Sequence, residues 1–165
     1  MKNLIYNAIR TPDGTVLESY DVHDFRGRKQ ADGKEYAVDG GLHYARRLFS
    51  DDDFKELSLY DDEPHVVQRE VIKWGTYGKC GNQPFSRVAV EDMTTGHIVA
   101  VLSDCRPSYV HEVCMWRELE ARLTLISEHF FRHIEPEVMD NMVEVIHMIS
   151  RKIERLIDER SNNSG

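Results

Sequence analysis

The sequence predicts an α+β fold, with an antiparallel, hairpin-rich N-terminal part followed by a helical C-terminal part. Two observations lead to this prediction. Short Asp-Gly turns recur in the first half of the chain and separate stretches that alternate as β-strands do. After residue 90 the apolar residues change to the three-and-four spacing of helices. We therefore expect a β-rich domain over residues 1–90 and a helical region over residues 91–165.

Turn chemistry sets the first two hairpins. The Pro-Asp-Gly turn at residues 12–14 joins strands over residues 4–9 and 16–20, because proline fixes φ and glycine accepts the positive φ of the reversal. The Ala-Asp-Gly-Lys turn at residues 31–34 joins the next pair of strands. Gly40-Gly41 then breaks the strand, and we expect positive φ there.

The middle of the chain holds shorter elements. Residues 42–49 fit either a strand or a short helix, and residues 54–60 alternate between two acidic turns. Residues 66–74 resemble a longer strand, and a glycine-rich loop follows over residues 75–84. A last short strand is expected over residues 86–90.

The C-terminal region consists of three predicted helices. Thr94 is placed to cap a short helix, and Pro107-Ser108 opens a longer one over residues 109–134. Glu135-Pro136 interrupts this helix, because proline is tolerated in the first turn of the helix that follows. Residues 161–165 are expected to form a polar, frayed tail.

The final helix carries an apolar seam with heptad spacing. Neighbouring valines widen this seam beyond what one helix of the same chain would cover, so we expect homo-oligomerisation, most simply as a dimer. The alternative is packing against the preceding helix within the chain. The candidate oligomer interface consists of Met142, Ile146, Ile149, Ile153 and Leu156.

Composition limits the possible partners. The 165-residue chain has a formal net charge of −8, which disfavours an electrostatic grip on nucleic acid. Its three cysteines form no Cys-x-x-Cys motif, so the sequence indicates neither a zinc ribbon nor a disulfide framework. No apolar run reaches the roughly 18 residues of a membrane span, and the N-terminus does not resemble a signal peptide. We expect an intracellular protein with no membrane partner, no metal and no cofactor.

Two predicted hairpins bring a histidine–aspartate pair near a second aspartate and histidine. His23, Asp24, Asp39 and His43 would suit a divalent metal, and a small metal-dependent hydrolase is the alternative function. In the other interpretation, the two aspartates accept backbone N–H bonds in turns. Nucleophile motifs such as G-x-S-x-G are absent, so we favour a protein without catalysis.

Several short motifs, taken in order, resemble a group of small uncharacterised proteins of tailed bacteriophages. The resemblance covers about residues 9–102. It implies an accessory protein made in the cytoplasm of an infected bacterium. Relatives with Cys knuckles look like zinc-ribbon hairpins, whereas this chain has turns in place of the knuckles. The motifs are Thr11-Pro-Asp-Gly-Thr15, His23-Asp-Phe25, Tyr36-Ala-Val-Asp-Gly-Gly41, Trp74-Gly-Thr-Tyr-Gly-Lys79, Gln83-Pro84 and Asp92-Met-Thr-Thr-Gly-His-Ile98.

The leading functional prediction is a non-enzymatic binding protein that acts on host processes as a counter-defence factor. Its partner would be a host protein or a nucleotide signal that it sequesters. Arginines would meet phosphate through charge-assisted hydrogen bonds, and aromatic rings would stack on a base. The candidate ligand-binding residues are His23, Arg26, Asp39, His43, Tyr44, Arg46, Arg47 and Trp74.

Overall fold

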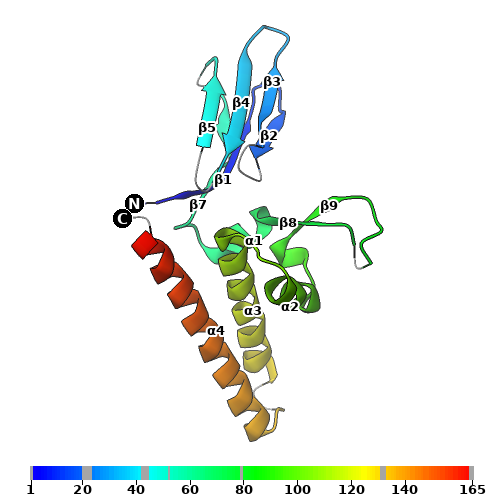
Figure 1. The fold of residues 1–165 in the computed structure, drawn as a ribbon, viewed down its shortest axis with the longest axis vertical. Coiled ribbons are helices and arrows are strands. Elements are labelled where there is room, and N and C mark those ends of the chain that lie inside the picture. The colour runs from blue at the N-terminus through cyan, green and yellow to red at the C-terminus, as the bar shows by residue number, and fades with distance from the viewer. Residues whose placement is uncertain are drawn as a thin grey trace. The chain divides into compact units, whose positions relative to one another are not determined.

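The computed structural model describes residues 2–19, 24–41, 45–51, 53–78, 80–130 and 133–163 (Figure 1). It has antiparallel sheets toward the N-terminus and helices toward the C-terminus, so the predicted α+β fold is confirmed. The chain forms two compact units, Met1–Pro64 (unit 1) and His65–Gly165 (unit 2). The predicted boundary at residue 90 is therefore displaced, because a short helix and a hairpin before residue 90 belong with the helices.

In unit 1, the first sheet is built around strand β1 (Leu4–Arg10). Strand β2 (Val16–Ser19) pairs with it in the predicted hairpin, with Ile9 opposite Leu17. Gly14 closes this turn with a φ of 86°. Two short strands, β6 (Lys55–Glu56) and β7 (Leu59–Tyr60), also pair with β1 and occupy the segment that was expected to alternate.

The second sheet of unit 1 has the order β3 (Arg26–Lys29), β4 (Glu35–Gly40) and β5 (Ala45–Phe49). Residues 45–49 are thus a strand, one of the two alternatives for that segment. Gly40 has the expected positive φ of 72°, whereas Gly41 does not. A hydrophobic cluster in the core of unit 1 consists of the buried side chains of Ile9, Leu17, Tyr36 and Val38. Phe49 and Phe54 pack against this cluster.

Unit 2 begins with helix α1 (His65–Val71), where the sequence predicted a strand over residues 66–74. Only residues 73–76 of that segment are extended, as strand β8 (Lys73–Thr76), which pairs with β9 (Ser86–Ala89). Gln68 is buried, Ile72, which directly follows the helix, is buried four residues later, and Val66 is 59% exposed. This is the spacing of one helix face and not the alternation of a strand.

The helices of unit 2 follow the predicted order. A 3₁₀ turn, η1 (Val90–Asp92), leads to α2 (Thr95–Asp104), and the Thr94 hydroxyl caps α2 by accepting a hydrogen bond from the His97 N–H at 3.2 Å. Helices α3 (Tyr109–Phe130) and α4 (Pro136–Asn163) pack against each other. Helix α4 includes residues 161–163, which we expected to be frayed. The most buried apolar side chains of unit 2 include Val90, Met93, Ile98, Val101 and Met115.

The seam of the final helix is covered within the chain. Ile149, Ile153 and Leu156 are 3%, 6% and 8% exposed, and Met142 and Ile146 are half-buried. Because α3 packs along α4, the intrachain alternative accounts for the burial of this seam. A dimer through these five residues stays a prediction.

Candidate functional site

Arg47, a predicted phosphate ligand, is held inside unit 1. Its Nε donates to Asn7 Oδ1 at 2.9 Å, and its two Nη atoms donate to the Glu56 carboxylate at 2.7 and 3.1 Å. Nη2 also donates to the Ser58 hydroxyl. This guanidinium therefore joins β5 to the β6–β7 region, and its hydrogen bonds to Glu56 are the bidentate kind that would otherwise bind a phosphate.

The other described ligand candidates of unit 1 lie on the neighbouring strands β3, β4 and β5. Arg26 pairs with Asp24 at 2.9 Å, and Asp39 lies opposite Arg46 in the β4–β5 register. His23, His43 and Tyr44 lie outside the described residues. The predicted convergence of histidines and aspartates is therefore not tested by the structure.

Trp74 belongs to unit 2 and anchors the β8–β9 hairpin to α3. Its ring meets the His111 ring edge-on, with centroids 5.5 Å apart. His111 Nε2 lies 3.1 Å from the carbonyl oxygen of Lys73, in the same strand. Trp74 is half-buried, so its role in the structure is packing, although the sequence predicted it to stack on a base.

The opposite side of the hairpin carries a different set of side chains, because successive residues of a strand point to opposite faces. Trp74 lies opposite Val88 and shares its face, whereas Gly75 lies opposite Arg87 on the other face. Two residues further toward the loop on each strand are Tyr77 and Phe85. We call the set Gly75, Tyr77, Phe85 and Arg87 the outer hairpin face.

The aromatic rings of the outer hairpin face are exposed and in contact with each other. Tyr77 and Phe85 are 58% and 50% exposed, with ring centroids 5.4 Å apart. The Arg87 guanidinium carbon lies 5.1 Å from the Phe85 ring centroid, within cation–π range. Phe85 lies over Gly75 so closely that a Cβ there would be 2.8 Å from its ring. The glycine thus leaves room for the Phe85 ring, which is tilted by 58° to the Tyr77 ring and has the Arg87 guanidinium over it.

The segment that contains the hairpin, residues 71–90, carries a positive net charge, whereas the whole chain carries a negative one. Residues 71–90 contain Lys73, Lys79 and Arg87 and no acidic residue, although the whole chain has a net charge of −8. The outer hairpin face therefore lies in a locally basic segment, which favours an anionic ligand. Figure 1 shows the hairpin extending away from the helices of unit 2.

Internal hydrogen bonds order the loop of the hairpin. The N–H of Gly81 donates to the Gly78 carbonyl at 3.0 Å, and that of Gln83 donates to the Tyr77 carbonyl at 2.8 Å. Gly78 has a φ of 79°, and its N–H donates to the Thr76 hydroxyl at 3.0 Å. These three N–H groups therefore already have partners within the loop.

A second polar centre lies inside unit 2, around the fully buried side chain of Glu118. Its carboxylate accepts hydrogen bonds from Arg122 Nε at 2.7 Å and His65 Nε2 at 3.1 Å, and Arg69 Nη2 lies 3.1 Å away. Arg122 also donates to the Glu91 carbonyl at 3.0 Å. Burial lowers the pKa of His65, more than the nearby Glu118 carboxylate raises it. A neutral His65 and two arginines thus balance one buried carboxylate, which ties α1, η1 and α3 together.

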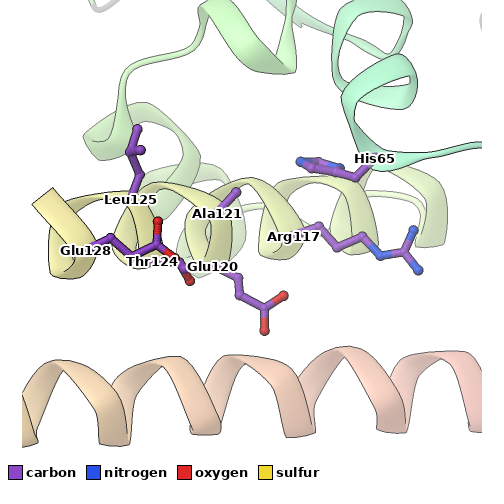
Figure 2. Close-up of a pocket in the computed structure, with 7 residues that line it drawn as sticks. All are labelled: His65, Arg117, Glu120, Ala121, Thr124, Leu125 and Glu128. Atoms are coloured by element: carbon purple, nitrogen blue, oxygen red, sulfur yellow. The ribbon is translucent and has the colours of Figure 1, made fainter.

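An open groove of about 550 Å³ runs beside this centre along α3 (Figure 2). Figure 2 shows His65 reaching it from α1, while Glu120 extends toward α4. The groove carries two carboxylates against one guanidinium, so it lacks the basic character of the hairpin. Its lining residues are His65, Arg117, Glu120, Ala121, Thr124, Leu125 and Glu128.

Comparisons with protein-family models, curated proteins and solved structures gave no match for this chain. Within the described residues, no three His, Cys, Asp or Glu side chains are grouped so that they could hold a metal ion. In the same part of the chain, no helix combines the length and apolarity needed to cross a membrane.

Trp74 was predicted from the sequence as a ligand, whereas the three exposed side chains on the other side of the hairpin, Tyr77, Phe85 and Arg87, were not. Two signals in the sequence point to them. One is the run of twenty residues, 71–90, without an acidic residue, and the other is the placement of Tyr77 and Phe85 around a glycine loop. Reading residues 66–74 as one long strand hid the hairpin in which these residues pair.

Proposed function

We propose that this protein is a non-enzymatic binding protein that holds a nucleotide on the outer hairpin face. The base would stack on the exposed ring of Phe85, with the Tyr77 ring tilted by 58° beside it. Base–aromatic stacking contributes about 1–3 kcal/mol per base. Arg87, whose guanidinium lies over the Phe85 ring, would donate charge-assisted hydrogen bonds to phosphate.

The single observation behind this proposal is the exposed aromatic pair beside Arg87 in an acid-free segment. Aromatic residues and arginine are also enriched where proteins bind other proteins, so a host protein is the other candidate occupant. The local excess of positive charge favours the nucleotide. The setting that we propose, counter-defence in an infected bacterium, rests on the motif resemblance alone.

Calorimetric titration of the full chain with adenosine and guanosine mono- and triphosphates tests the proposal. We expect saturable binding that weakens as salt is added, because exposed charges are screened. Phe85→Ala should cost about 1–3 kcal/mol of binding free energy, the contribution of one stacked base. Arg87→Gln should weaken the triphosphates more than the monophosphates.

Phe25→Ala is the matched control. Phe25 is also exposed, at 64%, and its ring also lies against a glycine, Gly27, but it follows an acidic residue in unit 1. Binding that survives Phe85→Ala, or that Phe25→Ala weakens equally, would contradict the proposal, as would a wild-type chain that binds none of these nucleotides.

The alternative function is a small metal-dependent hydrolase that uses His23, Asp24, Asp39 and His43. It stays a prediction, because both histidines lie outside the described residues. Recovery of the ligand after denaturation separates the two functions. A binding protein returns the nucleotide intact, whereas a hydrolase returns product and requires a metal ion.

A further inference from the structure

The α3–α4 hairpin has two flanks, and different side-chain contacts between the helices mark each of them. Glu112 of α3 pairs with Lys152 of α4 at 3.1 Å on one flank. On the other flank, the Ser150 hydroxyl donates to Glu120. Near the start of α3, Arg160 lies over the Tyr109 ring at 4.5 Å. The residue numbers of these partners run in opposite directions, so the two helices are antiparallel.

Heptad spacing extends the Glu112–Lys152 flank toward the far end of the hairpin. Residues seven apart lie on the same side of packed helices. Ile126 lies two heptads after Glu112 in α3, and Val138 lies two heptads before Lys152 in α4. Since the helices are antiparallel, Ile126 and Val138 lie side by side on this flank. Val145 lies between Val138 and Lys152 in the same row.

This flank is apolar and exposed at its far end. Ile126, Val138 and Val145 are 43%, 50% and 39% exposed, and Met148, one turn beyond Val145, is 56% exposed. We call these four residues the flank patch. An exposed apolar cluster of this kind commonly marks a protein–protein contact. The buried seam of Ile149, Ile153 and Leu156 lies beside it, on the side of α4 that packs on α3.

The charged residues next to the flank patch indicate which partner would bind there. Residues 136–149 of α4 contain three acidic residues and no lysine or arginine. Residues 150–163 contain four basic residues, Arg151, Lys152, Arg155 and Arg160, and three acidic ones, Glu154, Asp158 and Glu159, so the charge is negative in the first half and slightly positive in the second. Glu137 and Glu144 are one heptad apart on one edge of the patch, and Arg151 continues their row. A parallel copy would place like charges together, whereas an antiparallel copy would place acidic residues against basic ones.

We propose that the flank patch binds a second copy of this chain, with the two α4 helices antiparallel about a two-fold axis near residues 146–147. In this register Val145 meets Met148 of the second copy, and the same contact is repeated by symmetry. Glu144 then lies opposite Arg151 of the second copy, and Glu137 lies opposite Arg155. The apolar contact and the two charge pairs thus place the axis within about two residues of one another, at the middle of α4.

Sedimentation of the full chain at micromolar and higher concentrations tests the dimer, and two charge reversals test its geometry. Glu144→Arg and Arg151→Glu each create two like-charge contacts in a symmetric dimer. Each should raise the dimer dissociation constant by about tenfold or more. An equimolar mixture of the two variants should form a heterodimer, because each reversed residue then meets its opposite charge.

Glu154→Arg is the matched control, since Glu154 lies one turn beyond Ser150, which marks the other flank. It should leave the dimer unchanged, and far-UV circular dichroism should show the same helix content in all variants. A monomeric wild type overturns the proposal. So does a dimer that both reversals leave intact, or a mixture of the two variants that stays monomeric. If the chain is monomeric and the patch is covered by another protein, the second copy is the wrong occupant.

Discussion

Glu118 is the residue on which the polar interior of unit 2 depends. Its side chain is fully buried, and the groups around it, Arg69, Arg122 and His65, come from two helices. A buried charge is tolerated only when it is paired and hydrogen-bonded. Removing one partner of such a set leaves the others buried without a counter-charge.

We therefore expect Glu118→Gln to destabilise unit 2 by about 3–5 kcal/mol, the usual cost of breaking a buried ion pair. The amide keeps the volume but leaves the Arg122 guanidinium without the Glu118 carboxylate, and leaves Arg69 with Glu91, 3.7 Å away, as its carboxylate partner. Denaturant unfolding followed by tryptophan fluorescence measures this change. Glu128→Gln, at an exposed position on the same helix, should change stability by no more than about 0.5 kcal/mol. Equal effects of the two variants would contradict the role assigned to Glu118.

His65 should make unit 2 sensitive to acid. Burial lowers the pKa of His65 in the folded state below its ordinary value of 6.5. Between these two pKa values the unfolded chain binds more protons than the folded chain. The contribution of His65 to stability is therefore complete above pH 6.5 and is lost as the pH falls through the folded-state pKa.

The free energy of unfolding should thus fall with pH below about 6.5 in the wild type, and His65→Gln should reduce this slope. Glutamine retains a nitrogen donor for Glu118 but does not titrate. His147→Gln, at an exposed position of α4, serves as the control and should keep the wild-type slope. If the free energy of unfolding of His65→Gln depends on pH as steeply as that of the wild type, other groups cause the acid sensitivity.

At the scale of elements, the glycine of strand β8 should control the aromatic surface. Gly75 has no positive φ, so alanine fits its backbone, but a Cβ would lie 2.8 Å from the Phe85 ring. Gly75→Ala should displace this ring from Arg87 and Tyr77, and ring-proton chemical shifts of Tyr77 measure the displacement. Gly96→Ala, which meets no atom within 4 Å, should leave those shifts unchanged. Unaltered Tyr77 shifts in Gly75→Ala would mean that the glycine does not position the rings.

Local chemistry made several elements predictable from the sequence. The Asp-Gly turns fix the first two hairpins because only certain residues accept the backbone of a tight reversal, and Gly14 and Gly33 have the positive φ that such turns need. Thr94 was predictable as a helix cap for a similar reason, since its hydroxyl satisfies an N–H in the first turn.

Elements decided by tertiary packing were not predictable in this way. Helix α1 buries Gln68, which is 4% exposed, and exposes Val66, so its hydrophobic pattern does not reveal its buried face. The partners of one candidate ligand could not be predicted for a related reason. Arg47 looks like a phosphate ligand in the sequence, but Glu56, nine residues away, accepts two of its hydrogen bonds. Partners of this kind depend on how the strands meet, which the sequence pattern does not report.

At the scale of the whole molecule, the two compact units have separate cores. The core of unit 1 includes Ile9 and Val38, and that of unit 2 includes Met115 and Ile98; all four are fully buried. Each unit thus buries its own apolar surface, which is the property of a domain that folds by itself. Both tryptophans, Trp74 and Trp116, belong to unit 2, so tryptophan fluorescence reports on that unit alone.

We therefore expect core variants to destabilise one unit at a time. Ile9→Ala should cost unit 1 about 2–5 kcal/mol, because it removes a buried side chain and leaves a cavity. Amide hydrogen exchange should then speed up across β1 and β4, while the fluorescence transition of unit 2 keeps its midpoint. Met115→Ala should do the reverse, lowering the fluorescence midpoint and leaving exchange in β1 unchanged. If each variant instead lowers the stability of both units by the same free energy, the chain unfolds in a single cooperative transition. The two units, which meet at residues 64 and 65, would then not unfold independently.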